Sequence, residues 1–238
     1  YNPKHIELTA EDERNIRTIT DDIKSYITRS NKVSNIGYHT RDAHAKGYCA
    51  FKAKFEILDN IPKEYAQGLY AISGIHDAVI RFSNGASRVS PDRKLGLAQG
   101  LAIKVFDVPG KKLAPGEEDS TTFDFNLINH PVFFCNRIED YAYISKLFLE
   151  LPDYAEKGAR GKAKLAFNWL TNYGSRLPNK ESFKTFKALG GFTMIEPQNT
   201  LLYDFHSQGE VRHGLYMAKI KGTPTAGSAQ KGTRRKLD

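Results

Sequence analysis

The 238-residue sequence predicts an α+β fold in which helices lie beside an antiparallel sheet or barrel. Between residues 48 and 128, apolar and polar side chains alternate with period two, as in strands that bury one face. The segments that join these runs contain no amphipathic stretch of helix length, so neighbouring strands are expected to be antiparallel. On either side of this region the apolar residues recur at steps of three and four, which is typical of helices.

The composition narrows the class of protein. The chain is 40% hydrophobic and 11% aromatic, enough for a substantial core. It has no run of about 20 apolar residues and no signal peptide, so no membrane insertion is expected. The net charge of +8 lies largely in helical stretches and at the C-terminus, without spaced Cys and His or an RNA-binding motif, so no nucleic-acid partner is expected either.

Two cysteines, Cys49 and Cys135, are too few for a disulfide framework, and neither belongs to a CxxC zinc motif. We interpret both as packing residues. They favour the cytoplasm, with the periplasm or an organelle after processing as alternatives.

Residues 1–30 are expected to form an N-terminal helix or arm. The apolar stripe Ile16, Ile19, Ile23 and Ile27 has helical spacing, and Thr9 is placed to cap the helix.

The next region, 31–222, holds the expected strands at 49–57, 78–83, 100–108 and 123–128. A polar group precedes the first of them: Arg41, His44 and Lys46 lie where that strand enters the core. This placement suggests that these polar side chains have a functional role there.

Three helices are expected after the strands. The first, 136–151, opens with Asn136 and Glu139 in capping-box spacing. The others are expected at 162–173 and 180–189, the last closed by Gly190 and Gly191. Strand character returns in 199–207 and 211–222, and 223–238 reads as a basic linker or tail.

Four segments, taken in order, resemble the haem catalase family, in particular its small catalase-related peroxidases. They are RDAHAKGYCAFKAKFEI, VIRFSNG, GLAQGLAIKVFDVPG and FDFNLINHPVFF. The resemblance implies that 31–222 is a closed antiparallel β-barrel with surrounding helices and a haem b. It also implies breakdown of hydrogen peroxide or an organic hydroperoxide, and a possible homo-oligomer or larger assembly.

The resemblance assigns catalytic roles to three residues. His44 would stand over the open face of the haem within the barrel and carry a proton from one peroxide oxygen to the other. Ser83 would hydrogen-bond the other ring nitrogen and fix its tautomer. Asn129 would lie in reach of His44 and donate a hydrogen bond to the peroxide.

Cofactor-binding roles follow in the same way. Arg41 and Arg81 match the arginines that hold the haem propionates. Phe134 would pack against the porphyrin, and Ala43 is apolar as in catalases. In the related allene oxide synthases, the residue directly before the histidine looks like a Thr. Ala43 at this place therefore favours hydrogen peroxide over a lipid hydroperoxide.

The chain departs from the family in one respect. Catalases bind iron from the second side through a tyrosine in an Arg-x-x-x-Tyr pattern on a late helix. That spacing occurs at Arg137–Tyr141 and Arg212–Tyr216, but without the family's surroundings. We expect the metal ligand beyond Asp238, in a longer protein. Two alternatives stay open, a non-catalytic catalase-like scaffold or subunit without functional haem, and a lipid hydroperoxide isomerase of the allene oxide synthase type.

Overall fold

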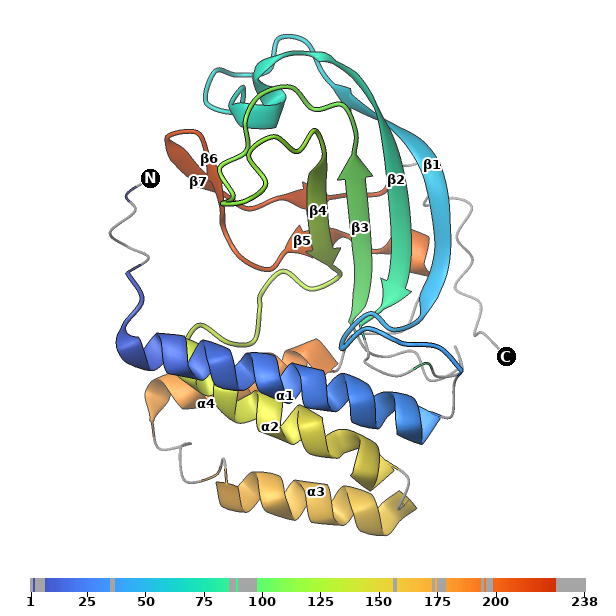
Figure 1. The fold of residues 1–238 in the computed structure, drawn as a ribbon, viewed down its shortest axis with the longest axis vertical. Helices are drawn as coiled ribbons and strands as arrows, with labels where there is room; N and C mark the ends of the chain where they lie inside the picture. Colours follow the sequence, from blue (N-terminus) through green and yellow to red (C-terminus); the bar gives the residue numbers. More distant parts are fainter. Residues whose placement is uncertain are drawn as a thin grey trace.

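The protein is a mixed α/β structure in which a curled antiparallel sheet stands over a layer of helices (Figure 1). The computed structural model describes residues 7–34, 37–85, 98–155, 158–172, 179–193 and 199–225, together with Asn2, Val89, Gly174 and Ile195.

Six strands form the main sheet, in the order β1-β2-β3-β4-β5-β8, and every neighbouring pair is antiparallel. Their bounds are β1 Gly47–Ile57, β2 Gly74–Asn84, β3 Gln99–Val105, β4 Phe123–Ile128, β5 Phe205–Ser207 and β8 Lys221–Gly222. A separate hairpin joins β6 (Val211–His213) to β7 (Tyr216–Ala218), and two short 3₁₀ helices, η2 (Gly68–Ala71) and η5 (Thr200–Leu202), precede β2 and β5.

The concave face of the sheet carries the core. Alternate residues of β3 and β4, among them Leu101, Val105 and Phe125, are buried and pack against Tyr203 and Phe205, which lie just before and within β5. The predicted alternation is therefore confirmed for β4, whereas in β3 the consecutive residues Gln99, Gly100 and Leu101 are all buried.

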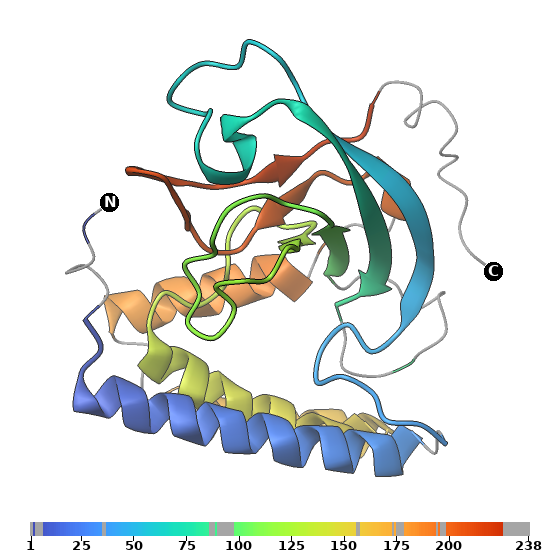
Figure 2. The same cartoon turned by 45° about the horizontal axis from the view of Figure 1, so that its top comes forward.

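The sheet is a half-barrel. Figure 2 shows β1 and β2 curling around the concave face. Among the described residues, strand pairing runs from β1 to β8 without joining the two, so the closed barrel that the resemblance implies is not shown. Phe51 on β1 lies on the concave side yet is 49% exposed, because β1 is an edge strand and nothing described covers its outer half.

Helix α1 (Ala10–Ser34) forms the N-terminal element that the sequence predicts. Thr9 caps it: the backbone N–H of Asp12 donates to Thr9 Oγ1 at 3.1 Å, and the Thr9 N–H donates to Asp12 Oδ2 at 3.0 Å. The helix lies along α2 (Ile138–Ala155), as both views show (Figures 1 and 2). Among its residues 10–29, Tyr26 is buried whereas Ile16 is 39% exposed, so the predicted stripe begins one turn too early.

The remaining helices are α3 (Gly158–Asn172) and α4 (Lys180–Thr193). The prediction that Gly190 and Gly191 close the last helix is wrong, because α4 continues through both to Thr193. Tertiary contacts override the low helix propensity of glycine here. Helix α2 begins at Ile138, one residue later than a cap at Asn136 requires. The predicted basic tail lies outside the described residues from 226 onward, and none of the described helices is long and apolar enough to cross a membrane.

Candidate functional site

A histidine is held in a defined position where β1 begins. His44 lies in the turn before β1 and has a φ of 57°, uncommon for a residue other than glycine. Its Nδ1 lies 3.0 Å from Oγ of the buried Ser83, near the end of β2, which is the contact that the resemblance implies. The guanidinium of Arg81 donates from Nη2 to the His44 carbonyl at 2.9 Å. The backbone and the ring of His44 are thus both fixed by β2.

The imidazole rests on a glycine of the neighbouring strand. A Cβ added at Gly100 would lie 2.5 Å from Cε1 of His44, in still closer contact with Nδ1, and 2.9 Å from Ser83 Oγ. No side chain fits there without moving the ring. Since Gly100 pairs with Ser83, β2 and β3 together form the surface that carries His44.

The surroundings keep the imidazole neutral. Burial lowers the pKa of His44, and the positive charges of Arg81 and Arg41 act in the same direction, against a backbone hydrogen bond with Asn84 and the negative charge of Asp42, which raise it. His44 Nδ1 faces Ser83, and a hydrogen bond with the backbone of Asn84 also reaches the imidazole. The site can therefore serve as a general base at neutral pH.

Two arginines lie beside this histidine without counter-charges. Burial lowers the pKa of the Arg81 guanidinium, and the charge of Arg41 lowers it further, so the two groups repel each other. Neither forms an ion pair with any carboxylate of the described part of the chain. Such a pair attracts an external carboxylate, which a guanidinium can bind through two parallel hydrogen bonds.

Asn129 is held by the backbone of Gln99. Its backbone N–H donates to the Gln99 carbonyl at 3.1 Å, and its Oδ1 accepts from the Gln99 N–H at 2.7 Å. No hydrogen bond joins it to His44 or Ser83 within the described residues. Gln99 and Gly100 are consecutive on β3, so their side-chain directions point to opposite faces of the sheet. His44 covers the face of Gly100, while Asn129 is partnered with Gln99.

The remaining predicted cofactor contacts are placed as follows. Ala43 is half-buried directly before His44. Phe134 is buried, but it stacks on Tyr141 of α2, with ring centres 6.0 Å apart, and also contacts Phe133. Its contact with a porphyrin stays a prediction.

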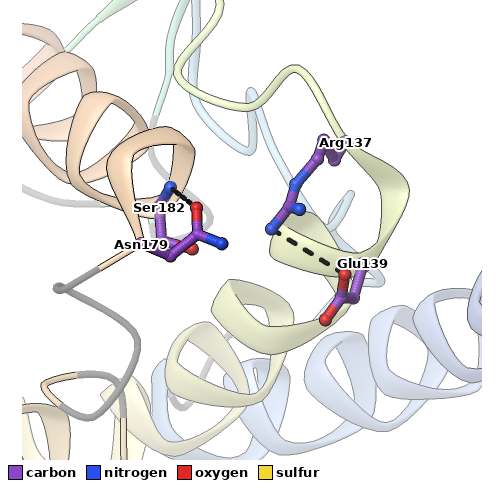
Figure 3. Close-up of a pocket in the computed structure, with 4 residues that line it drawn as sticks. All are labelled: Arg137, Glu139, Asn179 and Ser182. Carbon is purple, nitrogen blue, oxygen red and sulfur yellow. Dashed lines mark hydrogen bonds and ion pairs between the residues drawn. The ribbon is translucent and has the colours of Figure 1, made fainter.

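A cavity of about 250 Å³ lies between α2 and α4, lined by Arg137, Glu139, Asn179 and Ser182 (Figure 3). Arg137 donates from Nε and Nη2 to the two carboxylate oxygens of the fully buried Asp140, each at 3.0 Å. Asn179 Oδ1 accepts from the Ser182 N–H at 3.3 Å and caps α4. The groups that line the cavity take part in these hydrogen bonds, so we interpret the cavity as part of the polar contact between α2 and α4.

Both Arg-x-x-x-Tyr pairs have structural roles. The Arg137 guanidinium is engaged with Asp140, and Tyr141 packs in the aromatic cluster. Arg212 and Tyr216 belong to the β6–β7 hairpin, where Arg212 Nε donates to the Gly214 carbonyl.

A cofactor that carries carboxylates would find two arginines without an ion pair among the described residues, Arg41 and Arg81, beside the His44 imidazole. In the same part of the chain, no group of three or more His, Cys, Asp or Glu side chains could hold a metal ion. Comparison with protein-family models and with curated proteins gave no match for the chain.

Sequence reasoning missed Gln99 and Gly100. Gln99 stands at the alternating position of Leu101 and Val105, so a polar residue continues a buried series. That position was the available signal, but it depends on knowing which face is buried.

Proposed function

We propose that the protein is a haem b enzyme that breaks down hydrogen peroxide, as a catalase or a catalase-related peroxidase. The observation that supports this best is the neutral His44, fixed by Ser83 and seated on Gly100. An imidazole held in place by Ser83, beside two guanidinium groups without an ion pair among the described residues, suits proton transfer next to an anionic cofactor.

Haem b, when bound, supplies the iron redox chemistry that cleaves the O–O bond. His44 Nε2 takes the proton from one peroxide oxygen and returns it to the other, so that water can leave. Ser83 keeps Nδ1 engaged throughout, and the ring does not rotate between the two transfers. Acid–base help of this kind is typically worth about 100- to 10,000-fold in rate.

Arg41 and Arg81 would bind the propionates, and Phe134 would lie near the porphyrin. Asn129 would donate a hydrogen bond to the peroxide from Nδ2, which has no hydrogen-bond partner among the described residues. The apolar Ala43 supports hydrogen peroxide over a lipid hydroperoxide. We also propose that the barrel closes along β1, since Phe51 leaves an uncovered apolar surface there. The cytoplasm is the compartment we propose, since Cys49 and Cys135 are both free.

The test is a haem titration of the full-length protein, followed by oxygen evolution from peroxide and by peroxidase assays. We expect a Soret band and turnover, and a loss of about 100-fold or more in His44→Ala. His76→Ala is the matched control, since His76 is a half-buried histidine at the other end of β2. Turnover within a few-fold of the parent in His44→Ala would reject the acid–base role.

The same measurements separate the alternatives. A protein that takes up no haem supports the non-catalytic scaffold. A haem protein that leaves hydrogen peroxide untouched but isomerises a fatty-acid hydroperoxide supports the allene oxide synthase type.

A further inference from the structure

We propose that helix α3 is a membrane-docking surface, through which the protein lies on a bilayer that contains anionic lipid, without crossing it. The residues that carry the proposal form the outer side of the helix, here called the α3 face: Arg160, Ala163, Lys164, Ala166, Phe167 and Leu170. They belong to a different element from the site at His44, so the proposal does not depend on the proposed enzymatic function.

Helix α3 has one side against the protein and the other side open. It lies at the outer edge of the helical layer (Figure 1), and among the described elements its contacts are chiefly with α2. Gly161 is buried and Asn168, about two turns along, is half-buried, so these two residues mark the side that faces α2. With 3.6 residues per turn, positions 163, 166, 167 and 170 are turned away from that side.

The open side of α3 is apolar. A surface helix that packs on one side normally carries polar residues on the opposite side. Here Phe167 is 64% exposed and Leu170 is 61% exposed, and the neighbouring exposed positions are alanines. Single exposed apolar residues are common, but a contiguous apolar stripe on one helix marks an interaction surface. The α3 face therefore fits an apolar phase or partner.

The charge of α3 selects the class of partner. The helix contains Arg160, Lys162 and Lys164 but no Asp or Glu. Arg160 and Lys164 are exposed, and neither forms an ion pair with a carboxylate of the described chain. Cations beside an apolar stripe are typical of helices that lie in the interface of an anionic membrane, where the basic groups contact phosphates and the apolar groups enter the acyl boundary.

The same charges disfavour a second copy of the chain as the partner. A two-fold interface places the same patch of both subunits together, so it would bring two sets of cations close to each other. An anionic lipid surface neutralises them instead. The hydroxyl at the end of the face also tolerates lipid, because Thr171 Oγ1 donates to the Phe167 carbonyl at 3.0 Å within the helix.

Co-sedimentation of the full-length protein with vesicles tests the proposal. We expect binding to vesicles of phosphatidylcholine and phosphatidylglycerol, weaker binding at high salt, and little binding to phosphatidylcholine alone. Phe167→Ala should weaken binding by about tenfold, and Lys164→Ala by about fivefold. The proposal is overturned if the protein binds neither kind of vesicle, or binds both equally.

The matched controls are Phe183→Ala and Lys180→Ala, which remove an exposed phenylalanine and an exposed lysine from α4. Both variants should bind like the parent, and all four should keep the parent's midpoint of urea unfolding. If the α4 variants weaken binding as much as the α3 variants, the net charge of the chain causes it and the proposal is wrong. It is also wrong if the protein binds no vesicles but forms dimers that Phe167→Ala dissociates, as measured by analytical ultracentrifugation.

Discussion

Replacing Gly100 by alanine should dislodge His44. The added Cβ would lie 2.5 Å from Cε1 of the imidazole, whereas ordinary contacts begin at 3.4 Å, so the ring has to move by about 0.9 Å. In the unchanged protein, His44 Nδ1 lies 3.0 Å from Ser83 Oγ. Unless β3 itself shifts, the displacement takes Nδ1 out of hydrogen-bonding range of this hydroxyl. We expect a loss of about 1–3 kcal/mol in the free energy of unfolding from the overpacking.

The activity should fall as well. Misplacement of a catalytic group by about 1 Å can cost 100-fold in rate, so turnover of peroxide is expected to fall by about that factor. The assays are urea denaturation, peroxide turnover, and NMR titration of His44, whose pKa should rise as the ring becomes solvated. Gly74→Ala is the matched control, because Gly74 is also a strand glycine and a Cβ there meets nothing within 4 Å. If Gly100→Ala keeps the parent's stability and the parent's His44 pKa, His44 does not rest on Gly100.

Three further predictions follow from single groups. Burial lowers the pKa of His44 below its ordinary 6.5, so its contribution to stability is present above pH 6.5 and is lost as the pH falls towards the folded-state pKa. When the free energy of urea unfolding is plotted against pH, His44→Gln should flatten the curve in this pH range. Burial raises the pKa of Cys135 to about 12, so at about pH 8 a thiol reagent should leave Cys135 unmodified in the native protein and modify it in urea, as read by mass spectrometry. Asp140→Ala should lower the free energy of urea unfolding by about 2–4 kcal/mol, since it leaves buried hydroxyls and Arg137 without their carboxylate. Glu139 is half-exposed, so Glu139→Ala should cost less than about 1 kcal/mol. Equal losses would contradict the role of Asp140 in connecting α2 to α4.

Local patterns predicted most of the elements. The strand at 123–128 matches β4, and Thr9 caps α1 as its position indicates. Where the prediction failed, a contact distant in sequence decided the outcome. Helix α4 runs on past Gly190, and its Ser182 and Thr185 hydroxyls donate to Asp140 of α2. No local window of sequence contains that information.

The candidate site was predictable only in part. The resemblance pointed to the contact between His44 and Ser83, and the structure has it. It also puts Asn129 in reach of His44, which stays a prediction, since the structure shows only that Asn129 is hydrogen-bonded to the backbone of Gln99. Which face of β3 each residue occupies depends on strand register, and register is a property of pairs of strands that the alternation within one strand does not fix.

Strand register determines the surroundings of His44. Asn84 pairs with Gln99, and one step along, Ser83 pairs with Gly100. Gln99 therefore shares its face of β3 with the buried Leu101 and Val105, whereas Gly100 lies against His44 on the other face. A slip of one residue would exchange the faces and put Gln99 under the imidazole. The buried residues that hold β2, β3 and β4 in register therefore determine the geometry of His44, and a change that loosens this register should displace the ring.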